Sequence, residues 1–552
     1  MEASDSKEST SPSQKPVSRR NFLKITAAGV VVVAAAATGG YYYLTTQKGG
    51  GTAKTTAVLD FNNEIGNFDP HRENYPDDSY LSAIFSHWIE QNADLAYAPG
   101  LVSVWQWNSD KTELDLTLNN NVKFHDGSQF KADDLIFSLQ RMQDPKAPFA
   151  GVYGAFGTPV RKDDYHVVLP MTRFDPSMAV WIGFLAAFIV PKDAFNKAGS
   201  ADSFFKNPVG SGPYKFVSFS GNVLKLAAFE EYYRGKPSID NIVFNSVIDP
   251  VTRATDVESG GANFTAAVNA SDYGRLSTTS GLRGLTGAVS LVFQLFYTPY
   301  FEPWKNEDLR LALHYAIDKQ SIEKNVLLNF GVALSTVAAP QYKSYPANYT
   351  FPYDPAKAKQ ILSSNGYTIS NPLKIDVNAF QGVQISDFQV MQAVAQMWAQ
   401  VGVQANLIPM TQQQFFTLRD GGKLGALATD VWTDPTGDPI NNVGYTFKTD
   451  GAFAMLPNVQ IRQQLNLVDY TGYYGQDGKG KLKDIIDPVF NTVDDIARYN
   501  AGKLACQYAS DHGLVIPLYQ QHLPYVMQSK YNYTPQGSGW LRAESLTASS
   551  AT

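Results

Sequence analysis

Side chains that could support catalysis or bind a metal are scattered through this sequence rather than grouped at the spacings that such chemistry requires. His87 and Glu90 have the i, i+3 spacing of two ligands on one helical turn, but this spacing is common by chance. Carboxylate pairs such as Asp133 and Asp134 lie in segments with a helical pattern, where they are expected to form solvated faces. No metalloprotease, serine-hydrolase, Walker-loop or dinucleotide-binding motif occurs in the sequence. We therefore predict no catalytic residue, no metal site and no cofactor.

Composition narrows the class of protein further. The chain has 552 residues, of which 44% are hydrophobic, so two or more domains are expected. Lys and Arg number 45 against 51 Asp and Glu, and the net charge of -6 argues against nucleic acid as a partner. The single cysteine, Cys506, excludes an internal disulfide or a cysteine-rich metal cluster and is expected to be an inert apolar thiol.

Residues 1–50 have the features of an export signal. Arg19 and Arg20 resemble the twin-arginine motif, and an uncharged run follows over 25–44. Small residues in this run offer cleavage sites, whereas its length and the tyrosines at 41–43 would also suit a membrane anchor. The sequence predicts export through the Tat translocase and leaves release and membrane tethering as alternatives. Both place the remaining chain outside the cytoplasm.

The exported part mixes strands and helices. Leucines alternate with polar residues over 114–118 and predict a strand paired with 105–107, and a second hairpin is predicted over 214–229. Helices are predicted after the caps Asn306 and Asp354 and over 386–401, where Ser386 and Gln389 have capping-box spacing. No repeat is present, and this mixture indicates an α/β architecture in several pieces.

Ordered motifs from about residue 57 to 530 resemble one family, the extracytoplasmic solute-binding proteins of ABC importers, in the peptide-binding class (family 5). The most specific motifs are Asn67-Phe68-Asp69-Pro70-His71, Tyr97-Ala98-Pro99-Gly100-Leu101, Val122-Lys123-Phe124-His125-Asp126-Gly127 and Asn207-Pro208-Val209-Gly210-Ser211-Gly212-Pro213-Tyr214. Most of these residues are scaffold rather than site. Gly127, Gly210 and Gly212 are expected where the backbone needs a positive φ or a close approach.

The resemblance implies a two-lobed periplasmic-binding-protein-like fold (type II, cluster C), a flytrap with an additional subdomain. Lobe I would be discontinuous over 51–97, 207–295 and 506–552, the additional subdomain would span 98–206, and lobe II would span 296–505. The ligand would be enclosed between the two lobes.

In peptide-binding members of the family, the ligand backbone pairs with an extended segment from each lobe. One such edge matches Asn63, Glu64 and Ile65, and the other contains Trp432, Thr433 and Asp434. Trp432 is the side chain most expected to touch a ligand. The resemblance also gives Tyr297, beside the lobe crossing, and Tyr153, from a loop expected to face the cleft, as ligand-binding candidates.

The sequence departs from the family pattern three residues after Trp432. Peptide receptors commonly carry there an Asp that receives the peptide α-ammonium group, and this chain has Pro435. Asp434 or Asp438 would take that role if the loop bends. Alternatively the ligand is an oligosaccharide, because sugar receptors of this class use aromatic surfaces.

The resemblance therefore implies a monomeric binding protein without catalysis that closes on its ligand and docks on a membrane permease. A peptide ligand is expected first, an oligosaccharide second. A ligand sensor that presents its closed form to a membrane receptor is the alternative of another class.

Overall fold

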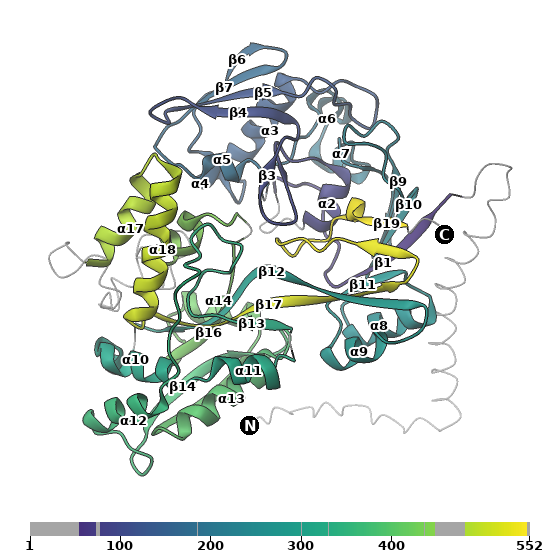
Figure 1. Cartoon of the computed structure of the whole chain (residues 1–552). Helices are drawn as coiled ribbons and strands as arrows, with labels where there is room; N and C mark the ends of the chain where they lie inside the picture. The colour runs from purple at the N-terminus through teal and green to yellow at the C-terminus, as the bar shows by residue number, and fades with distance from the viewer. Residues whose placement is uncertain are drawn as a thin grey trace, which may run out of the picture. The chain divides into compact units, whose positions relative to one another are not determined.

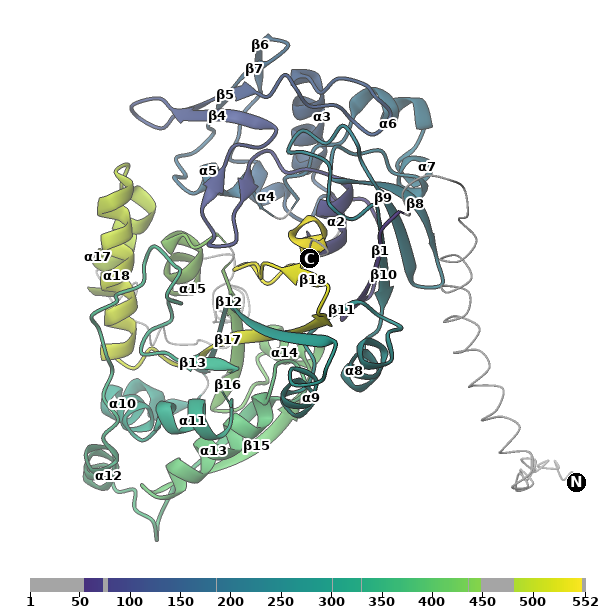
Figure 2. The same cartoon turned by 45° about the vertical axis from the view of Figure 1, so that its right-hand side comes forward.

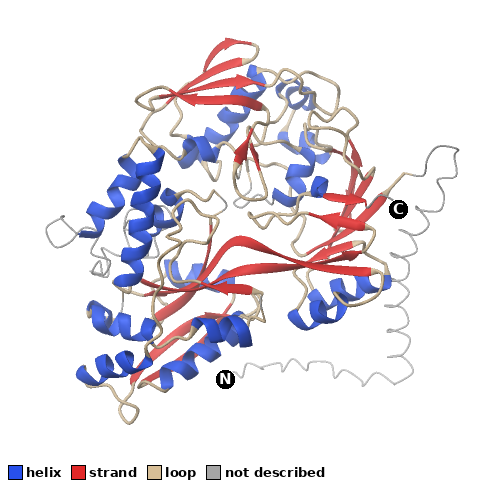
Figure 3. Ribbon diagram, viewed as in Figure 1, coloured by secondary structure: helices blue, strands red, loops and turns tan. Residues whose placement is uncertain are grey.

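The computed structural model describes residues 54–72, 78–184, 186–299, 301–328, 330–434, 436–447 and 481–548. Figure 1 shows the chain coloured by residue number, and Figure 3 shows the same view coloured by secondary structure. The predicted export signal over 1–50 and Pro435 lie outside the described residues. Among the described residues, no helix combines the length and the apolar character needed to cross a membrane.

One large mixed sheet organises the fold, in the strand order β15-β14-β16-β12-β17-β11-β1-β10-β9-β8, with β13 paired to β17 at the side. Neighbouring strands are parallel at β14–β15, β14–β16 and β1–β11 and antiparallel at β12–β16, β12–β17, β13–β17, β11–β17, β9–β10 and β8–β9. Its strands are β1 (Thr56–Phe61), β8 (Tyr214–Ser220), β9 (Val223–Ala228), β10 (Asn241–Ser246), β11 (Phe264–Ala266), β12 (Leu282–Tyr297), β13 (Gly331–Ala333), β14 (Leu373–Phe380), β15 (Val403–Met410), β16 (Leu427–Thr433) and β17 (Val515–Gln528).

Smaller sheets and the helices complete the fold. A four-stranded sheet in the order β4-β5-β7-β6 contains β4 (Val102–Trp107), β5 (Glu113–Leu118), β6 (Val160–Asp163) and β7 (His166–Pro170). Two hairpin pairs are β2 (Glu90–Gln91) with β3 (Tyr97–Ala98) and β18 (Tyr531–Tyr533) with β19 (Leu546–Ala548). Helices of six residues or more are α2 (Asp78–Ile84), α3 (Ala132–Gln143), α6 (Lys192–Ala198), α7 (Ala201–Lys206), α8 (Pro250–Ser259), α9 (Ala270–Leu276), α10 (Glu307–Tyr315), α11 (Lys319–Asn325), α12 (Pro355–Ser364), α13 (Asp387–Ala399), α14 (Gln412–Asp420), α17 (Lys481–Asn491) and α18 (Asp495–Asp511).

The antiparallel strands β12 and β17 are the longest in the sheet and run side by side through its middle (Figure 2). Both are strongly apolar, and the side chains of 292–297 and 515–519 are buried. Register shifts between Ala288 and Val292 and between Phe293 and Gln294 mark irregularities in the pairing, which allow a strand to bend. One continuous pair of strands therefore contributes to more than one core.

The buried apolar side chains form three main cores. One core contains β1, α2 and 525–546, the second extends from Trp88 to Ile189, and the third extends from Val292 to Tyr519 and also includes Leu95. Buried side chains within 292–296 and 506–519 pack with the third core. β12 and β17 therefore pass from one core into the next.

Most predicted elements are present. The first hairpin pairs β4 with β5 and buries Leu114, Leu116 and Leu118. The second pairs β8 with β9 and turns at Gly221 and Asn222, which have φ of 58° and 63°. These positive values match a two-residue hairpin turn.

Helix capping is as predicted at two helices and different at the third. Asp354 Oδ1 accepts from Lys357 N at 2.8 Å and begins α12, and Asn306 Oδ1 accepts from Asp308 N at 3.0 Å and begins α10. The capping box of Ser386 and Gln389 is wrong, because Ser386 has a φ of 57° and no capping hydrogen bond. The carboxylate of Asp387 instead accepts from the backbone N–H groups of 382–384, which pulls the chain before α13 into a tight turn.

The predicted glycine roles are confirmed. Gly127 has a φ of 88°. A methyl group on Gly210 would lie 2.0 Å from the backbone oxygen of Ile84, and one on Gly212 would lie 2.6 Å from the carbonyl carbon of Ile84. These two positions therefore require glycine so that the loop can lie against the C-terminal end of α2.

Candidate functional site

The strand pair β12–β16 presents the predicted aromatic surface. Trp432 lies opposite Val292 of β12, and Thr433 lies opposite Leu291. Both side chains of β16 are half-buried. Asp434 follows directly after the strand, and its backbone N–H donates to Ser290 O of β12 at 3.0 Å. The antiparallel pairing therefore fixes where the chain leaves the sheet and enters the loop that follows.

Asp434 organises that loop. Its Oδ1 accepts from Thr436 N at 3.1 Å, Thr436 Oγ1 at 2.6 Å, Gly437 N at 3.1 Å and Asn441 Nδ2 at 2.9 Å. The side chain is fully buried. Burial raises the pKa of Asp434 to about 7, against the opposing effect of these hydrogen bonds, and the neighbouring Asp438 adds to the rise. Near neutral pH this carboxyl group is therefore close to the midpoint of its titration.

Asp438 forms a buried ion pair with Arg498 of α18. Arg498 Nη1 donates to both carboxylate oxygens at 2.5 and 2.7 Å, and both side chains are 2% exposed. Arg498 Nη2 also contacts Asp495 at 3.2 Å, and Asp495 accepts from Lys111 Nζ at 3.1 Å. Lys111 stands in the turn between β4 and β5. A chain of charges thus connects the loop after β16 with the four-stranded sheet.

The β2–β3 hairpin closes over this loop. A methyl group on Gly437 would lie 3.8 Å from Leu95 Cδ1, in the turn of the hairpin. Burial raises the pKa of the Tyr97 hydroxyl, with additional contributions from the negative charges of Asp434 and Asp438. Asp175 adds a third carboxyl group, since its pKa is raised by burial and, to a smaller extent, by Asp438. Three acids and one arginine therefore share a largely buried region.

Several buried polar atoms of this region lack hydrogen-bond partners among the residues that the structure describes. They are Ser290 Oγ, Gln294 Oε1 and Asp434 Oδ2. Buried polar atoms are almost always hydrogen-bonded in native proteins, so a group of unpaired atoms points to a missing polar partner. Gln294 lies opposite Asp430, two residues before Trp432 on the same face of β16. The arrangement can hold a polar ligand against the end of β16.

The other predicted edge lies after β1. Asn63 and Glu64 are exposed, and Ile65 is 6% exposed within the core that contains β1. Ser246 Oγ donates to Asn63 O at 2.9 Å, which holds this stretch against the end of β10. The stretch is not part of a strand.

Two other predicted ligand residues are core residues. Tyr297 is fully buried, and its hydroxyl donates to Arg310 O at 2.7 Å. Tyr153 is also fully buried, and its hydroxyl lies 3.2 Å from Trp181 O and 3.1 Å from Phe184 O. Each phenol is therefore satisfied by backbone carbonyls. Neither side chain offers surface to a ligand here, because both are packed inside a core.

Sequence reasoning did not find Arg498, Tyr97 or Asp175. Tyr97 stands in a motif that was treated as scaffold, and Arg498 lies in a helix more than sixty residues after Trp432. Only the folded arrangement brings them to the loop after β16. The i, i+3 spacing of Asp495 and Arg498 was the one local signal available.

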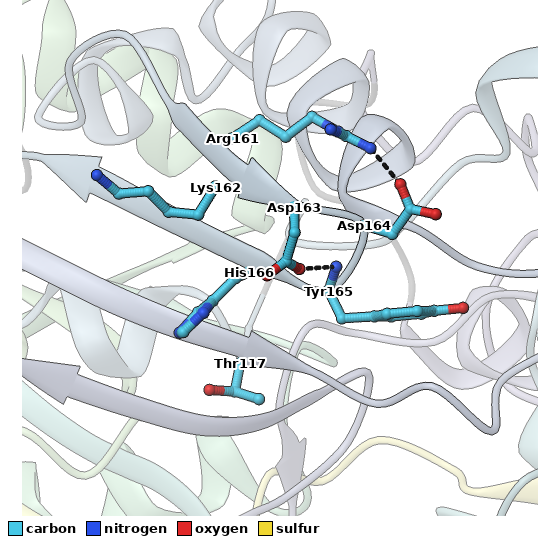
Figure 4. Close-up of a pocket in the computed structure, with 7 residues that line it drawn as sticks. All are labelled: Thr117, Arg161, Lys162, Asp163, Asp164, Tyr165 and His166. Carbon is cyan, nitrogen blue, oxygen red and sulfur yellow. Dashed lines mark hydrogen bonds and ion pairs between the residues drawn. The ribbon is translucent and has the colours of Figure 1, made fainter.

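A hollow of about 740 Å³ lies on the four-stranded sheet and is a weaker candidate (Figure 4). Its acids are engaged with neighbours, since Asp164 pairs with Arg161 and Asp163 accepts from Tyr165 N at 2.7 Å. Its polar side chains are partly or fully exposed and present no buried, unpaired group.

The metal-like spacing of His87 and Glu90 does not form a joint site. His87 Nε2 lies 3.3 Å from Asp78, whereas Glu90 accepts from the Tyr233 hydroxyl at 2.7 Å. Within the described part of the chain, no three His, Cys, Asp or Glu side chains are grouped to hold a metal ion. Cys506 is fully buried, and burial raises the pKa of its thiol to about 12.

Comparison with known proteins places this fold and site in context. The chain is 27% identical over 372 residues to heme-binding protein A of Haemophilus influenzae, which covers 62% of this chain and 67% of that protein. It is 28% identical over 373 residues to the dipeptide-binding protein of Escherichia coli, and the match covers 62% of this chain and 69% of that protein. It is 29% identical over 269 residues to the oligopeptide-binding protein AppA of Bacillus subtilis, and the match covers 47% of this chain and 49% of that protein.

Solved structures share the fold. HbpA2 from Haemophilus parasuis superposes with a TM-score of 0.75 at 18% identity, covering 89% of this chain and 99% of that chain. AppA from Bacillus subtilis in complex with a nonapeptide superposes with a TM-score of 0.68 at 19% identity. The superposition covers 90% of this chain and 99% of that chain. The predicted two-lobed α/β fold is thereby confirmed. The sequence profile described as "Bacterial extracellular solute-binding proteins, family 5 Middle" matches residues 96–454, and the chain belongs to this family of solute-binding proteins.

Proposed function

We propose that this protein is the extracytoplasmic substrate-binding component of an ABC transporter, which captures di- or oligopeptides between its lobes and delivers them to a membrane permease. The family is one of solute-binding proteins rather than enzymes. Relatives named as dipeptide- and oligopeptide-binding proteins support the peptide ligand.

The observation that carries the peptide proposal is the buried acidic region beside Trp432. Asp434 Oδ2 has no hydrogen-bond partner among the described residues, and Asp438, which pairs with Arg498, adds negative charge beside it. An α-ammonium group bound there would complete the hydrogen bonding and offset the negative charge. We propose that Asp434 takes the role that Pro435 cannot fill.

The proposed ligand contacts then follow from position. Trp432 and Thr433 supply a surface at the end of β16, and Asn63, Glu64 and Ile65 supply the edge from the other lobe. Asp438 is a positioning residue, because its carboxylate is engaged by Arg498. Tyr153 and Tyr297 are left out of the proposed site because both are buried in a core and hydrogen-bonded to backbone carbonyls.

We further propose that Arg19 and Arg20 direct export through the Tat translocase and that the protein acts as a monomer. The segment over 25–44 either anchors the protein to the membrane or is removed. Mass spectrometry of the protein from the membrane and soluble fractions would distinguish these outcomes.

A thermal-shift screen tests the peptide proposal. The protein is unfolded and refolded to remove any co-purified ligand and is then mixed with short peptides or oligosaccharides. A ligand at about 100 times its Kd adds about 2.7 kcal/mol of stability. Stabilisation by peptides is expected. Stabilisation by sugars alone would replace the peptide assignment with the oligosaccharide alternative.

The pH dependence of peptide affinity identifies the acid that holds the amine. Because the pKa of Asp434 is about 7, the carboxyl group must lose a proton to bind an ammonium group below that pH. The association constant is expected to rise about tenfold per pH unit well below pH 7 and to fall again above about pH 8, where the peptide α-amino group loses its own proton. Isothermal titration calorimetry with a free peptide and its N-acetylated form measures this. A pH slope shared by both peptides would exclude Asp434 as the amine receptor.

Trp432→Ala is expected to weaken ligand binding at least tenfold while leaving the fold intact, because the ring is only half-buried and lies at the end of its strand. Titration calorimetry measures the affinity, and circular dichroism checks the fold. Trp540→Ala, at another half-buried tryptophan, is the matched control. Unchanged affinity in a folded Trp432→Ala variant would remove Trp432 from the site.

A further inference from the structure

A second pocket lies at the junction of the β2–β3 hairpin, the loop 232–238 and the segment 534–547. Its volume is about 490 Å³, within the range of small-molecule sites. In Figure 1 the segment 534–547 (yellow) lies against α2 and β3 (purple), and Leu541 N donates to Ser79 Oγ of α2 at 3.0 Å. We infer that this junction pocket is a second ligand site, which takes a small zwitterion of the amino-acid type.

Charged side chains of both signs line the junction pocket. Glu90 is 5% exposed and is held by the Tyr233 hydroxyl at 2.7 Å and by Arg234 Nη1 at 3.3 Å. Arg542 is 7% exposed and donates to Asp78 at 2.9 Å. Buried ion pairs are costly to desolvate, and a cluster of them at the wall of a cavity is unusual unless the cavity uses the charges.

Glu544 provides the acceptor for a ligand cation. Its Oε2 is buried and has no hydrogen-bond partner among the described residues. Burial raises the pKa of Glu544, and the nearby Arg542 opposes that rise. Because Arg542 already donates to Asp78, a ligand ammonium group would supply the hydrogen bonds that Glu544 lacks.

Arg234 provides the donor for a ligand anion. Its side chain is 44% exposed and uses Nη1 toward Glu90, so other N–H groups of the fork remain for a carboxylate. Glu544 and Arg234 are close enough that each charge influences the pKa of the other. One carboxylate acceptor and one guanidinium donor in a small polar pocket match a molecule that carries both an ammonium and a carboxylate group.

The junction pocket is mechanically connected to the candidate site beside Trp432. Gly537 N donates to Ala93 O at 2.7 Å, and Ser290 N of β12 donates to Gly537 O at 2.6 Å. The same hairpin carries Leu95 against Gly437. Occupancy of the junction pocket would order two segments that close over the loop after β16. By linkage, a ligand in either site would then change the affinity of the other by the same factor.

The test is a thermal-shift screen of the refolded full chain with each of the twenty amino acids, followed by titration calorimetry of any that stabilises it. The methyl ester and the N-acetyl form of that amino acid are expected to bind at least tenfold more weakly, because each lacks one charge. Glu544→Gln is expected to weaken binding at least tenfold. Arg234 is partly exposed, so the fold is expected to tolerate its substitution. Arg234→Gln should weaken the binding of the amino acid but not the binding of methylammonium. Glu231→Gln, an exposed acid outside the pocket, is the matched control.

Three results would overturn the inference: no amino acid stabilises the protein, Glu544→Gln and Glu231→Gln bind alike, or the response disappears in Trp432→Ala. The last result would assign the amino acid to the site beside Trp432. This inference does not rest on the peptide proposal. If peptides fail to bind but an amino acid binds in a Glu544-dependent way, the peptide proposal fails and the junction site stands.

Discussion

Arg498→Met is expected to lower the free energy of unfolding by about 3–5 kcal/mol, because it leaves the carboxylate of Asp438 buried without its cation. Both carboxylate oxygens of Asp438 accept from Arg498 Nη1, and each side chain is only 2% exposed. The neighbouring Asp434 and Asp175 add negative charge to the same region. Methionine keeps most of the apolar length of the side chain, so the loss reports the charge rather than a cavity. Urea unfolding at pH 7.5 measures it.

Two variants make the Arg498 result interpretable. Arg275→Met removes an exposed arginine that pairs with Glu258 and Asp272, and it is expected to cost much less stability than Arg498→Met, because solvent screens exposed ion pairs. Arg498→Met combined with Asp438→Asn removes both charges and should recover at least half of the lost stability. Equal losses for Arg498→Met and Arg275→Met would show that the buried pair does not stabilise the loop after β16.

Asp434→Asn is expected to change how stability depends on pH. The pKa of Asp434 is about 7 in the folded protein and near 3.8 when unfolded, so the folded state holds the proton more tightly. The stabilisation due to this proton is complete below about pH 4 and is lost as pH rises to about 7, at about 1.4 kcal/mol per pH unit. The total is about 4 kcal/mol. Asparagine does not titrate, and its side-chain oxygen can accept the four hydrogen bonds that Asp434 Oδ1 now accepts.

The variant is therefore expected to gain stability relative to the natural protein as pH rises from 4 to 7, and the difference should stay constant above pH 8. Urea unfolding at each pH without ligand measures this. Asp420→Asn, at an exposed acid beside Arg419, is the matched control. Parallel pH curves for Asp434→Asn and the natural protein would contradict the raised pKa.

Local patterns were sufficient to predict the elements whose determinants lie within a few residues. Alternating leucines predicted β5, and Asp354 with Pro355 predicted the start of α12. The capping box at Ser386 failed because a stronger acceptor, Asp387, stands one residue later and gathers three N–H groups of the preceding turn. Sequence spacing identifies possible caps but does not decide which of two adjacent acceptors the backbone will use.

The sequence could propose site residues only where the family pattern follows a strand. Trp432 and Asp434 were proposed because they stand at fixed positions, in β16 and directly after it. Tyr297 and Tyr153 were expected near the ligand from their positions along the chain, but side-chain direction depends on packing, and both face a core. Arg498 and Tyr97 reach the loop after β16 from distant segments of the chain. No pattern in a single sequence predicts that residues so far apart lie close together in the fold.

The central place of β17 has a consequence for how the protein is made. β11 and β12 both pair with β17, and β1 pairs with β11, so the middle of the large sheet depends on a strand that begins at Val515. At about 5–20 residues per second, roughly half a minute to two minutes of synthesis precede that strand. From the synthesis of β12 until that of β17, β11 and β12 each lack a partner strand at one edge, which favours aggregation. The nascent chain therefore benefits from protection by chaperones over this interval, and a ribosome that stalls before Val515 releases a product whose large sheet lacks its middle strand.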